Sequence, residues 1–309
     1  SYAEQFNFTV EHEIAPWALV IKTAAIGNLG RHLYNTYDAN QPIPGPTAVD
    51  PRRPLYSIDP LLSTTSYFTT DGLSEYYAFQ LTADKRFSHG LSAILGYAWS
   101  HAIDDVPLEF GGGATGPQPQ DPRNIAAERG NSIIDMRHRL TLSYTWEFPF
   151  GKGKAMLNRG GIVDWVLGGW QTNGILTAQT GLPFSAVLQT STTNGTGSRP
   201  NGVGPVTYPH TLQQWFSPSA FSTPAPYTYG NLGRNTLFGP GRINWDMSLF
   251  KNFVIREQTR FEFRAEAFNV FNHPQFGLPN QNIGNAQVGQ ITSTVGKPRQ
   301  LQMGLRFQF

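Results

Sequence analysis

The sequence predicts an all-β fold, more specifically an antiparallel transmembrane β-barrel with long extracellular loops. The first observation is a recurring period of two, in which apolar and aromatic residues alternate with polar or small ones over segments of about ten residues. The second is that the connections between these segments alternate between short and long along the chain. The third is that aromatic residues gather near the segment ends, as in the two girdles of a membrane barrel. These are Trp17, Trp146, Phe148 and Phe150 at one end, and Tyr97, Trp99 and Phe271 at the other.

Nine strands are predicted from the alternation. The clearest has Leu140, Leu142, Tyr144 and Trp146 on one parity, with Arg139, Thr141, Ser143 and Thr145 on the other. A membrane strand needs about 9–11 residues, which this segment supplies. The predicted strands are 5–11, 17–26, 76–84, 91–100, 139–148, 167–179, 243–249, 260–267 and 300–309, and those at 17–26 and 167–179 show the weakest alternation.

The connections predict which side of the membrane each strand end faces. Short ones lie near 14–16, 87–90, 149–164 and 252–257, and long ones rich in Gly, Pro, Asn and Ser span about 28–71, 102–135, 180–241 and 272–298. Membrane barrels have short periplasmic turns and longer extracellular loops. Neighbouring antiparallel strands run in opposite directions. If the last of nine strands runs towards the periplasm, the first therefore does so as well. Because single-chain bacterial barrels have an even strand number, we expect further strands upstream.

Composition excludes several other classes. The chain has 309 residues, 32 Gly, 23 Pro and no Cys, with 14% charged residues and a formal net charge of +2. The weak charge predicts no nucleic-acid partner. No window is long and apolar enough for a transmembrane helix, and the lack of cysteine excludes disulfide scaffolds and thiolate metal sites. The first five residues show no basic or apolar leader, so we expect an export signal upstream.

The last eight residues form a motif of their own. Gln302, Gly304, Phe307 and Phe309 occupy the spaced polar, glycine and aromatic positions of a segment that resembles the β-signal of outer-membrane proteins. The resemblance implies that the barrel-assembly machinery reads this strand. Physically, an edge strand with an apolar stripe can pair with a partner strand during insertion.

The segment 260–276 resembles the end of TonB-dependent receptors, in which an Asn-Leu-Phe-Asp/Asn element closes the penultimate strand; here Asn269-Val270-Phe271-Asn272 stands in that place. Segments 30–33, 40–42, 135–139 and 168–171 resemble the Oar-like group, which carries an N-terminal carboxypeptidase-regulatory-like domain. The resemblance implies that residues 1–309 are the C-terminal part of a 22-stranded barrel in the bacterial outer membrane. The plug, the TonB box and the N-terminal domain are absent from it.

The resemblance further implies TonB-dependent uptake of a solute of the siderophore, oligosaccharide or peptide class, with neither enzymatic activity nor a cofactor. The implied partners are outer-membrane lipid, the barrel-assembly machinery, the solute, and TonB through the missing N-terminal region. Two alternatives stay open. One is a small self-contained outer-membrane pore or adhesin. The other is a secreted soluble carbohydrate-binding β-protein, which would require the apolar stripes to face a protein core.

Three groups of residues are candidates for a site. Arg260, Glu262, Arg264 and Glu266 form a row of alternating charge predicted to face the lumen, where pairing with neighbouring strands is favoured over a solute path. Aromatic residues of the longest loop could stack on a solute or pack the loop on itself. They include Tyr208, Trp215, Tyr227 and Tyr229. The loop between His101 and His138 holds several aspartates without metal-ligand spacing, and a solvated turn-rich loop is favoured there.

Overall fold

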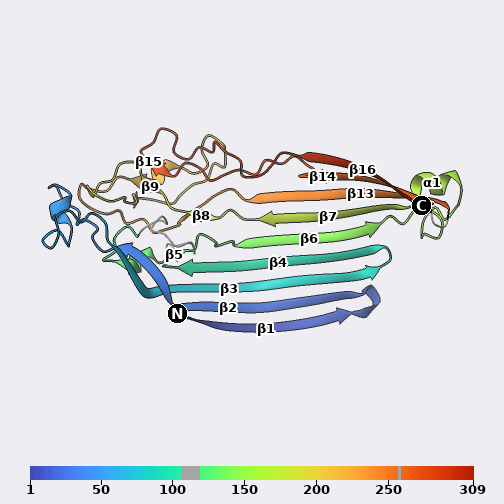
Figure 1. The fold of residues 1–309 in the computed structure, drawn as a ribbon, viewed down its shortest axis with the longest axis horizontal. Coiled ribbons are helices and arrows are strands. Elements are labelled where there is room, and N and C mark those ends of the chain that lie inside the picture. The colour runs from blue at the N-terminus through green and yellow to red at the C-terminus, as the bar shows by residue number, and fades with distance from the viewer. Residues whose placement is uncertain (106–118, 257–258) are drawn as a thin grey trace.

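The computed structural model describes residues 1–105, 119–256 and 259–309, and it is built around one antiparallel sheet. In the described ranges the long strands follow one another in chain order across the sheet, each paired with its neighbour (Figure 1). They are β1 (Tyr2–Ile14), β2 (Leu19–Asp38), β3 (Ser66–Ser88), β4 (Leu91–Asp104), β6 (His138–Glu147), β7 (Trp170–Gln179), β13 (Arg242–Arg256), β14 (Thr259–Phe268) and β16 (Gln300–Gln308). The nine predicted strands and the all-β fold class are therefore confirmed.

Short strands and helices lie in the connections between the long strands. The short strands are β5 (Gly130–Asn131), β8 (Pro183–Phe184), β9 (Val187–Leu188), β10 (Asn201–Gly202), β11 (Phe221–Ser222), β12 (Leu237–Phe238) and β15 (Asn282–Ile283). The helical turns are η1 (Ala15–Trp17), η2 (Asp50–Arg52), η3 (Ile125–Glu128) and η4 (Pro218–Ala220), and the α-helix is α1 (Ile162–Leu167). Among the described residues, none of these helices has the length and apolar character needed to cross a membrane.

The long loops gather at one end of the sheet and the short turns at the other, as predicted (Figure 1). We call these the loop end and the turn end. The loop 180–241 runs between β7 and β13 with the predicted bounds, and residues 89–90 make the tight turn between β3 and β4.

Several predicted boundaries are wrong. Strand β13 continues to Arg256, through most of the short connection expected near 252–257. The strand expected from Trp17 begins at Leu19 because 15–17 form η1, and the strand expected from Leu167 begins at Trp170 because α1 ends at Leu167. The connection expected at 28–71 covers only 39–65, since β2 and β3 continue pairing to Asp38 and Ser66. Backbone hydrogen bonds hold this outer part of the hairpin through register shifts near Leu33. This outer part does not contact lipid, so its apolar and polar side chains need not alternate strictly.

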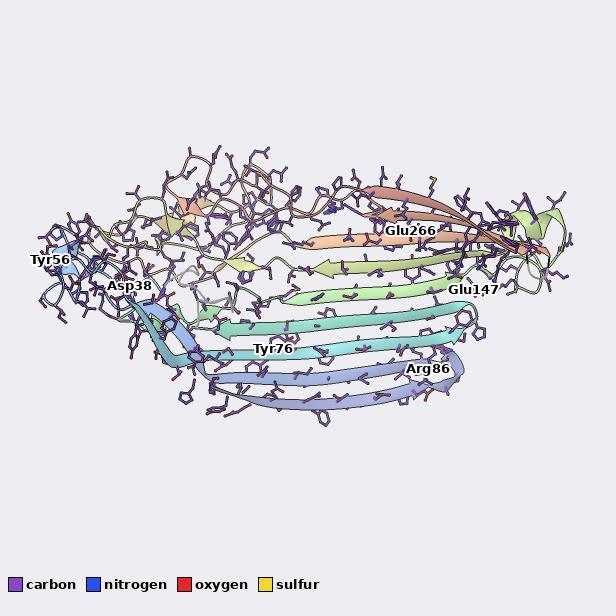
Figure 2. All side chains as sticks on the ribbon, viewed as in Figure 1. Asp38, Tyr56, Tyr76, Arg86, Glu147 and Glu266 are labelled. Carbon is purple, nitrogen blue, oxygen red and sulfur yellow. The ribbon has the colours of Figure 1, made fainter. Side chains whose placement is uncertain are left out.

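The two faces of the sheet differ in character. Phe8 and Phe79 flank Ala25 on neighbouring strands, and Phe79 pairs with Trp99, so these rings share one face. The same face at the other edge carries Phe261 opposite Phe307. Most of this surface is exposed, and Figure 2 shows side chains projecting from both sides of the strands. Since the apolar stripes do not face a protein core, the soluble alternative is wrong.

The buried apolar cluster of the described residues lies instead in the loops. Its fully enclosed members include Phe216 and Leu237. The cluster comprises Phe184, Ala186, Phe216, Ala220, Phe221, Leu237 and Ile283. Short ladders support it, with β8 paired to β12 and β9 paired in parallel to β15. The loops thus form a folded cap over one end of the sheet.

Candidate functional site

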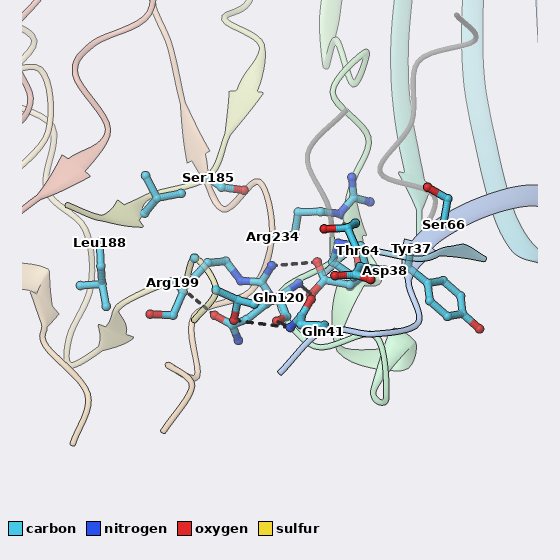
Figure 3. A pocket seen from close by; sticks show the side chains of 16 residues that line it. Tyr37, Asp38, Gln41, Thr64, Ser66, Gln120, Ser185, Leu188, Arg199 and Arg234 are labelled. Carbon is cyan, nitrogen blue, oxygen red and sulfur yellow. Dashed lines mark hydrogen bonds and ion pairs between the residues drawn. The ribbon is translucent and has the colours of Figure 1, made fainter. Parts of the chain in front are cut away.

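A cavity of about 560 Å³ opens within this cap at the loop end (Figure 3). Side chains from three loops that are distant in the sequence line it, together with the ends of β2 and β3. The charged and amide residues of the lining are Asp38, Gln41, Gln120, Glu128, Arg199 and Arg234. Tyr37, Ser66, Thr196 and Ser198 also line the cavity.

A buried ion pair forms the floor of the cavity. Arg199 donates from both terminal nitrogens to the Glu128 carboxylate, with N···O distances of 2.7 and 2.9 Å. Glu128 is only 1% exposed. Arg234 donates Nε to the Glu128 carbonyl oxygen at 2.8 Å and pairs with Asp104. Bidentate pairing fixes the guanidinium plane of Arg199, and hydrogen bonds to Glu128 and Asp104 hold that of Arg234, which offsets part of the cost of removing these charges from water.

An amide network ties the ion pair to the neighbouring loops. The Gln120 backbone amide donates to Glu128 Oε1 at 2.9 Å, and the Arg199 amide donates to Gln120 Oε1 at 2.6 Å. Gln41 Nε2 donates to the Gln120 carbonyl oxygen at 2.8 Å. Asp38 Oδ1 accepts the amides of Asn40 and Thr65, each at 2.9 Å, which closes the base of the 39–65 loop. The polar groups of the cavity are therefore held in place before any solute arrives.

The four predicted ligand residues lie in three different places. Tyr208 and Trp215 pack within the cap, because Trp215 Nε1 donates to the Phe238 carbonyl oxygen at 2.8 Å and the Phe238 amide donates to the Tyr208 hydroxyl at 3.3 Å. Burial raises the pKa of Tyr208. Tyr229 lies beside the cavity network, where its hydroxyl accepts from Gln41 Nε2 at 3.1 Å. Tyr227 is exposed on the cap surface. Solute contact by these four residues stays a prediction.

The charge row lies on the face of β14 opposite the apolar stripe. Register sets Glu262 beside Arg306 on β16 and Arg260 beside Gln308. Arg264 Nε donates to Glu266 Oε1 at 2.9 Å, and the Arg264 guanidinium lies 5.0 Å from the centre of the Phe250 ring. The lumen-facing structural role of this row, in which alternating charges pair with neighbouring strands, stays a prediction.

The residues of the terminal motif lie on β16, which is the last strand of the sheet order and pairs with β14. Gln302 is opposite Glu266, and Gly304 is opposite Arg264. The rings of Phe307 and Phe309 are 5.9 Å apart, and both are exposed.

The aspartates of the 102–135 segment have structural contacts. Asp135 accepts the Ala102 amide at 2.7 Å and pairs with Arg137 at 2.9 Å, while His101 Nδ1 lies 3.3 Å away. Asp105 accepts the Leu73 amide at 2.7 Å, and burial raises the pKa of its carboxyl. Within the described ranges, no group of three or more acidic or histidine side chains is arranged to hold a metal ion.

Sequence reasoning missed the cavity residues, although one signal pointed to two of them. The loop 180–241 contains Arg199 and Arg234 as its only Lys, Arg, Asp or Glu residues. Two isolated charges in a long uncharged segment need partners if they are buried. Their partners, Glu128 and Asp104, come from the preceding long connection and its strand end.

An antiparallel wall with an exposed apolar face, capped at one end by folded loops, defines an integral membrane protein of the β-barrel class. A family model described as "Outer membrane beta barrel domain" matches residues 1–302, and the chain belongs to this family. The protein is thus located in the outer membrane. No curated protein matches the chain.

One solved structure shares the fold, and two others align over the same part of this chain. The outer membrane transporter YddB from Escherichia coli is 8% identical, with a TM-score of 0.51, and the match covers 99% of this chain and 32% of that one. The ferric preacinetobactin receptor BauA from Acinetobacter baumannii is 10% identical, with a TM-score of 0.49, covering 99% and 29%. The ferripyoverdine receptor from Pseudomonas aeruginosa is 11% identical, with a TM-score of 0.46, covering 99% and 27%. The chain spans 27–32% of the length of these proteins.

Proposed function

We propose that this chain supplies wall strands and extracellular loops of a TonB-dependent transport receptor of the Oar-like group, and that its role is uptake of a solute rather than catalysis. The resemblance of 260–276 and of the dispersed segments to those receptors supports the proposal, as does the fold shared with a protein described as an outer membrane transporter. The observation that carries it is the loop-end cavity. Its volume of about 560 Å³ lies within the usual range of about 300–1,000 Å³ for ligand pockets.

The lining favours an uncharged polar solute of the oligosaccharide class over a charged siderophore or peptide. Arg199 and Arg234 are each paired with a carboxylate, and Asp38 uses Oδ1 to accept two backbone amides. The remaining lining includes the hydroxyl-bearing Thr64 and Ser66, which suit the hydroxyl groups of a sugar. Tyr37 adds an aromatic ring on which a sugar face can stack.

We further propose that residues 1–309 form one part of a larger barrel with the family's 22 strands, and that the plug and the TonB contact belong to the rest of the protein. β1 and β16 occupy the two edges of the sheet and do not pair with each other in the described residues. An open sheet edge is not tolerated in lipid, because unpaired backbone groups there cost several kcal/mol each. Further strands would close these edges.

Uptake assays test this function in the producing bacterium. Labelled neutral oligosaccharides and radioactive ferric citrate would be offered to cells with and without TonB. We expect TonB-dependent uptake of at least one oligosaccharide, and its loss in Tyr37→Ala. The matched control is Tyr67→Ala, whose ring lies 5.3 Å from that of Tyr37 but outside the cavity lining. Uptake that does not need TonB would instead indicate a passive pore. Uptake of ferric citrate alone would overturn the proposed solute class.

We also propose that β16 is the strand read by the barrel-assembly machinery, through Gln302, Gly304, Phe307 and Phe309. Its position at a sheet edge and its exposed aromatic pair support this role. The double change Phe307→Ala/Phe309→Ala should lower the amount of folded protein in the outer membrane more than Leu301→Ala/Met303→Ala does, although both shorten the same apolar stripe. If both double variants lower the amount of folded protein equally, the cause is lost lipid contact and not lost recognition by the assembly machinery.

A further inference from the structure

The connection between β6 and β7 is far larger than its role as a periplasmic turn requires. A two-residue turn joins β3 to β4 at the same end, whereas this connection spans 148–169 and contains α1. It also exposes many apolar side chains, with Ile162 at 82%. The exposed set is Met156, Leu157, Ile162, Val163, Trp165, Val166 and Leu167. Apolar residues at this density on a surface indicate a binding partner.

Contacts hold α1 on the lipid-facing side of the wall. Lys251 lies between Leu249 and Phe253 on the outward parity of β13, and its ammonium group donates to the Gly168 carbonyl oxygen at the end of α1. The Trp165 ring is 5.2 Å from the Phe253 ring, and Phe253 is 5.9 Å from Phe261 on β14. The apolar surface of α1 is therefore continuous with the lipid-facing stripe of the barrel.

The charged side chains of residues 149–169 lie apart from the apolar surface of α1. Asp164, the one charged residue of α1, turns inward, where its carboxylate accepts the Lys152 amide at 2.7 Å. Lys154 pairs with Glu147 at 2.7 Å. The side chains of Lys152 and Arg159 are exposed. A short apolar helix flanked by basic side chains matches the boundary between acyl chains and anionic headgroups, where tryptophan and lysine also concentrate.

We infer that residues 149–169 are an interfacial membrane anchor, with α1 lying in the headgroup region of the periplasmic phospholipid leaflet beside β13. Ile162 and Trp165 enter the upper acyl region, and Lys152 and Arg159 contact lipid phosphates. Lys251 fastens the end of the helix to the barrel wall and reaches the carbonyl from a lipid-facing position by extending its apolar stem. The anchor fixes the depth of the barrel at its periplasmic rim.

Site-specific fluorescence tests the anchor in the full-length protein. Residues 1–309 contain no cysteine, so Ile162→Cys can carry a single environment-sensitive dye once any cysteine elsewhere in the full-length protein is replaced by serine. The protein would be placed in nanodiscs of phosphatidylethanolamine and phosphatidylglycerol, which leave both membrane faces open to buffer. Leu305→Cys, 69% exposed on the lipid-facing stripe, is the buried-in-lipid reference, and Leu61→Cys, 92% exposed at the loop end, is the aqueous reference.

We expect nitroxide lipids labelled near the headgroup to quench the dye at Ile162, and aqueous iodide to quench it several-fold less than at Leu61. Replacing both Lys152 and Arg159 with Gln should raise iodide quenching at Ile162 and leave that at Leu305 unchanged. If the dye at Ile162 is open to iodide and untouched by nitroxide lipid, the anchor is wrong. That result would indicate that the apolar surface of α1 binds a periplasmic protein instead of lipid.

Discussion

The wall and the loop cap use the same kinds of apolar residue in opposite ways. On the wall, Phe8, Leu305 and their neighbours are exposed, while in the cap Phe216 and Leu237 are completely enclosed. The pairings differ as well, since long antiparallel ladders build the wall and two-residue ladders build the cap. One salt bridge from each region shows the same difference. The wall pair Lys22–Glu11 is exposed, and the cap pair Arg199–Glu128 is buried.

The difference reflects the medium that each region meets. Lipid already provides an apolar surrounding for the outward stripe, so the wall needs no internal apolar core and is held by backbone hydrogen bonds. The cap faces water and must order long irregular segments, which costs conformational entropy. It therefore needs an apolar cluster and a satisfied polar network. Mutations should consequently act through packing and buried charge in the cap, and through transfer to lipid on the wall.

The buried ion pair should give the largest effect. Glu128→Ala leaves Arg199 buried without its carboxylate and should cost the cap about 3–5 kcal/mol. Glu11→Ala on the wall should give no measurable change. Protease protection of the loops in the detergent-solubilised full-length protein measures the loss. Glu128→Leu/Arg199→Leu should recover most of it, and an unrecovered double variant would show that the hydrogen bonds to the pair, rather than the lone charge, set the cost.

Shortening an apolar side chain should give the second-largest effect. Leu237→Ala opens a cavity in the enclosed cluster and should cost about 2–5 kcal/mol. Leu305→Ala removes the same atoms from a lipid-facing position, where lipid chains refill the space, so its cost should be clearly smaller. The readout is again protease protection for Leu237 and the urea midpoint of the reconstituted barrel for Leu305. Similar costs at both positions would contradict the division between wall and cap.

A charge placed on either side of the wall should reveal which side faces lipid. Leu249 and Ser248 are adjacent near the middle of β13 and point to opposite faces. Leu249→Arg should destabilise the barrel by about 2–4 kcal/mol, the range for arginine at the bilayer midplane. Ser248→Arg should be tolerated beside Glu266, its neighbour on β14. Urea unfolding in lipid vesicles compares the two, and a greater loss at Ser248 would reverse the assignment of faces.

The wall was largely predictable from the sequence and the cap was not. Lipid on one face imposes a strict period of two, so strands such as β6 could be located from neighbouring residues alone. That signal disappears where β2 and β3 leave the membrane, and the outer part of their hairpin was missed. α1 was also missed, because a segment of six residues, five of them apolar, shows too little periodicity to separate a helix from a strand.

The cavity depends on contacts that no local pattern records. Glu128 and Arg199 come from different loops, and the connection between them includes β6 and β7. Aromatic content suggested Trp215 as a ligand residue, but the sequence alone left its packing in the cap equally open. Loop residues have no periodicity that assigns them to an inside or an outside. The isolated charges of 180–241 were the one available signal.

The smallest expected effect concerns Asp105 and depends on pH. Burial raises the pKa of this carboxyl, so the folded cap retains the proton at a pH at which the unfolded chain has released it. The stability contributed by the neutral form is present below about pH 3.9, the ordinary value for aspartate, and is lost as the pH rises through the raised pKa. Asp105→Asn does not ionise and keeps an oxygen for the Leu73 amide. It should therefore match the wild type in acid and become the more stable protein towards neutral pH, as measured by loop protection across the range. A variant that is weaker than the wild type at neutral pH would mean that the charged carboxylate strengthens the bond to Leu73 by more than its burial costs.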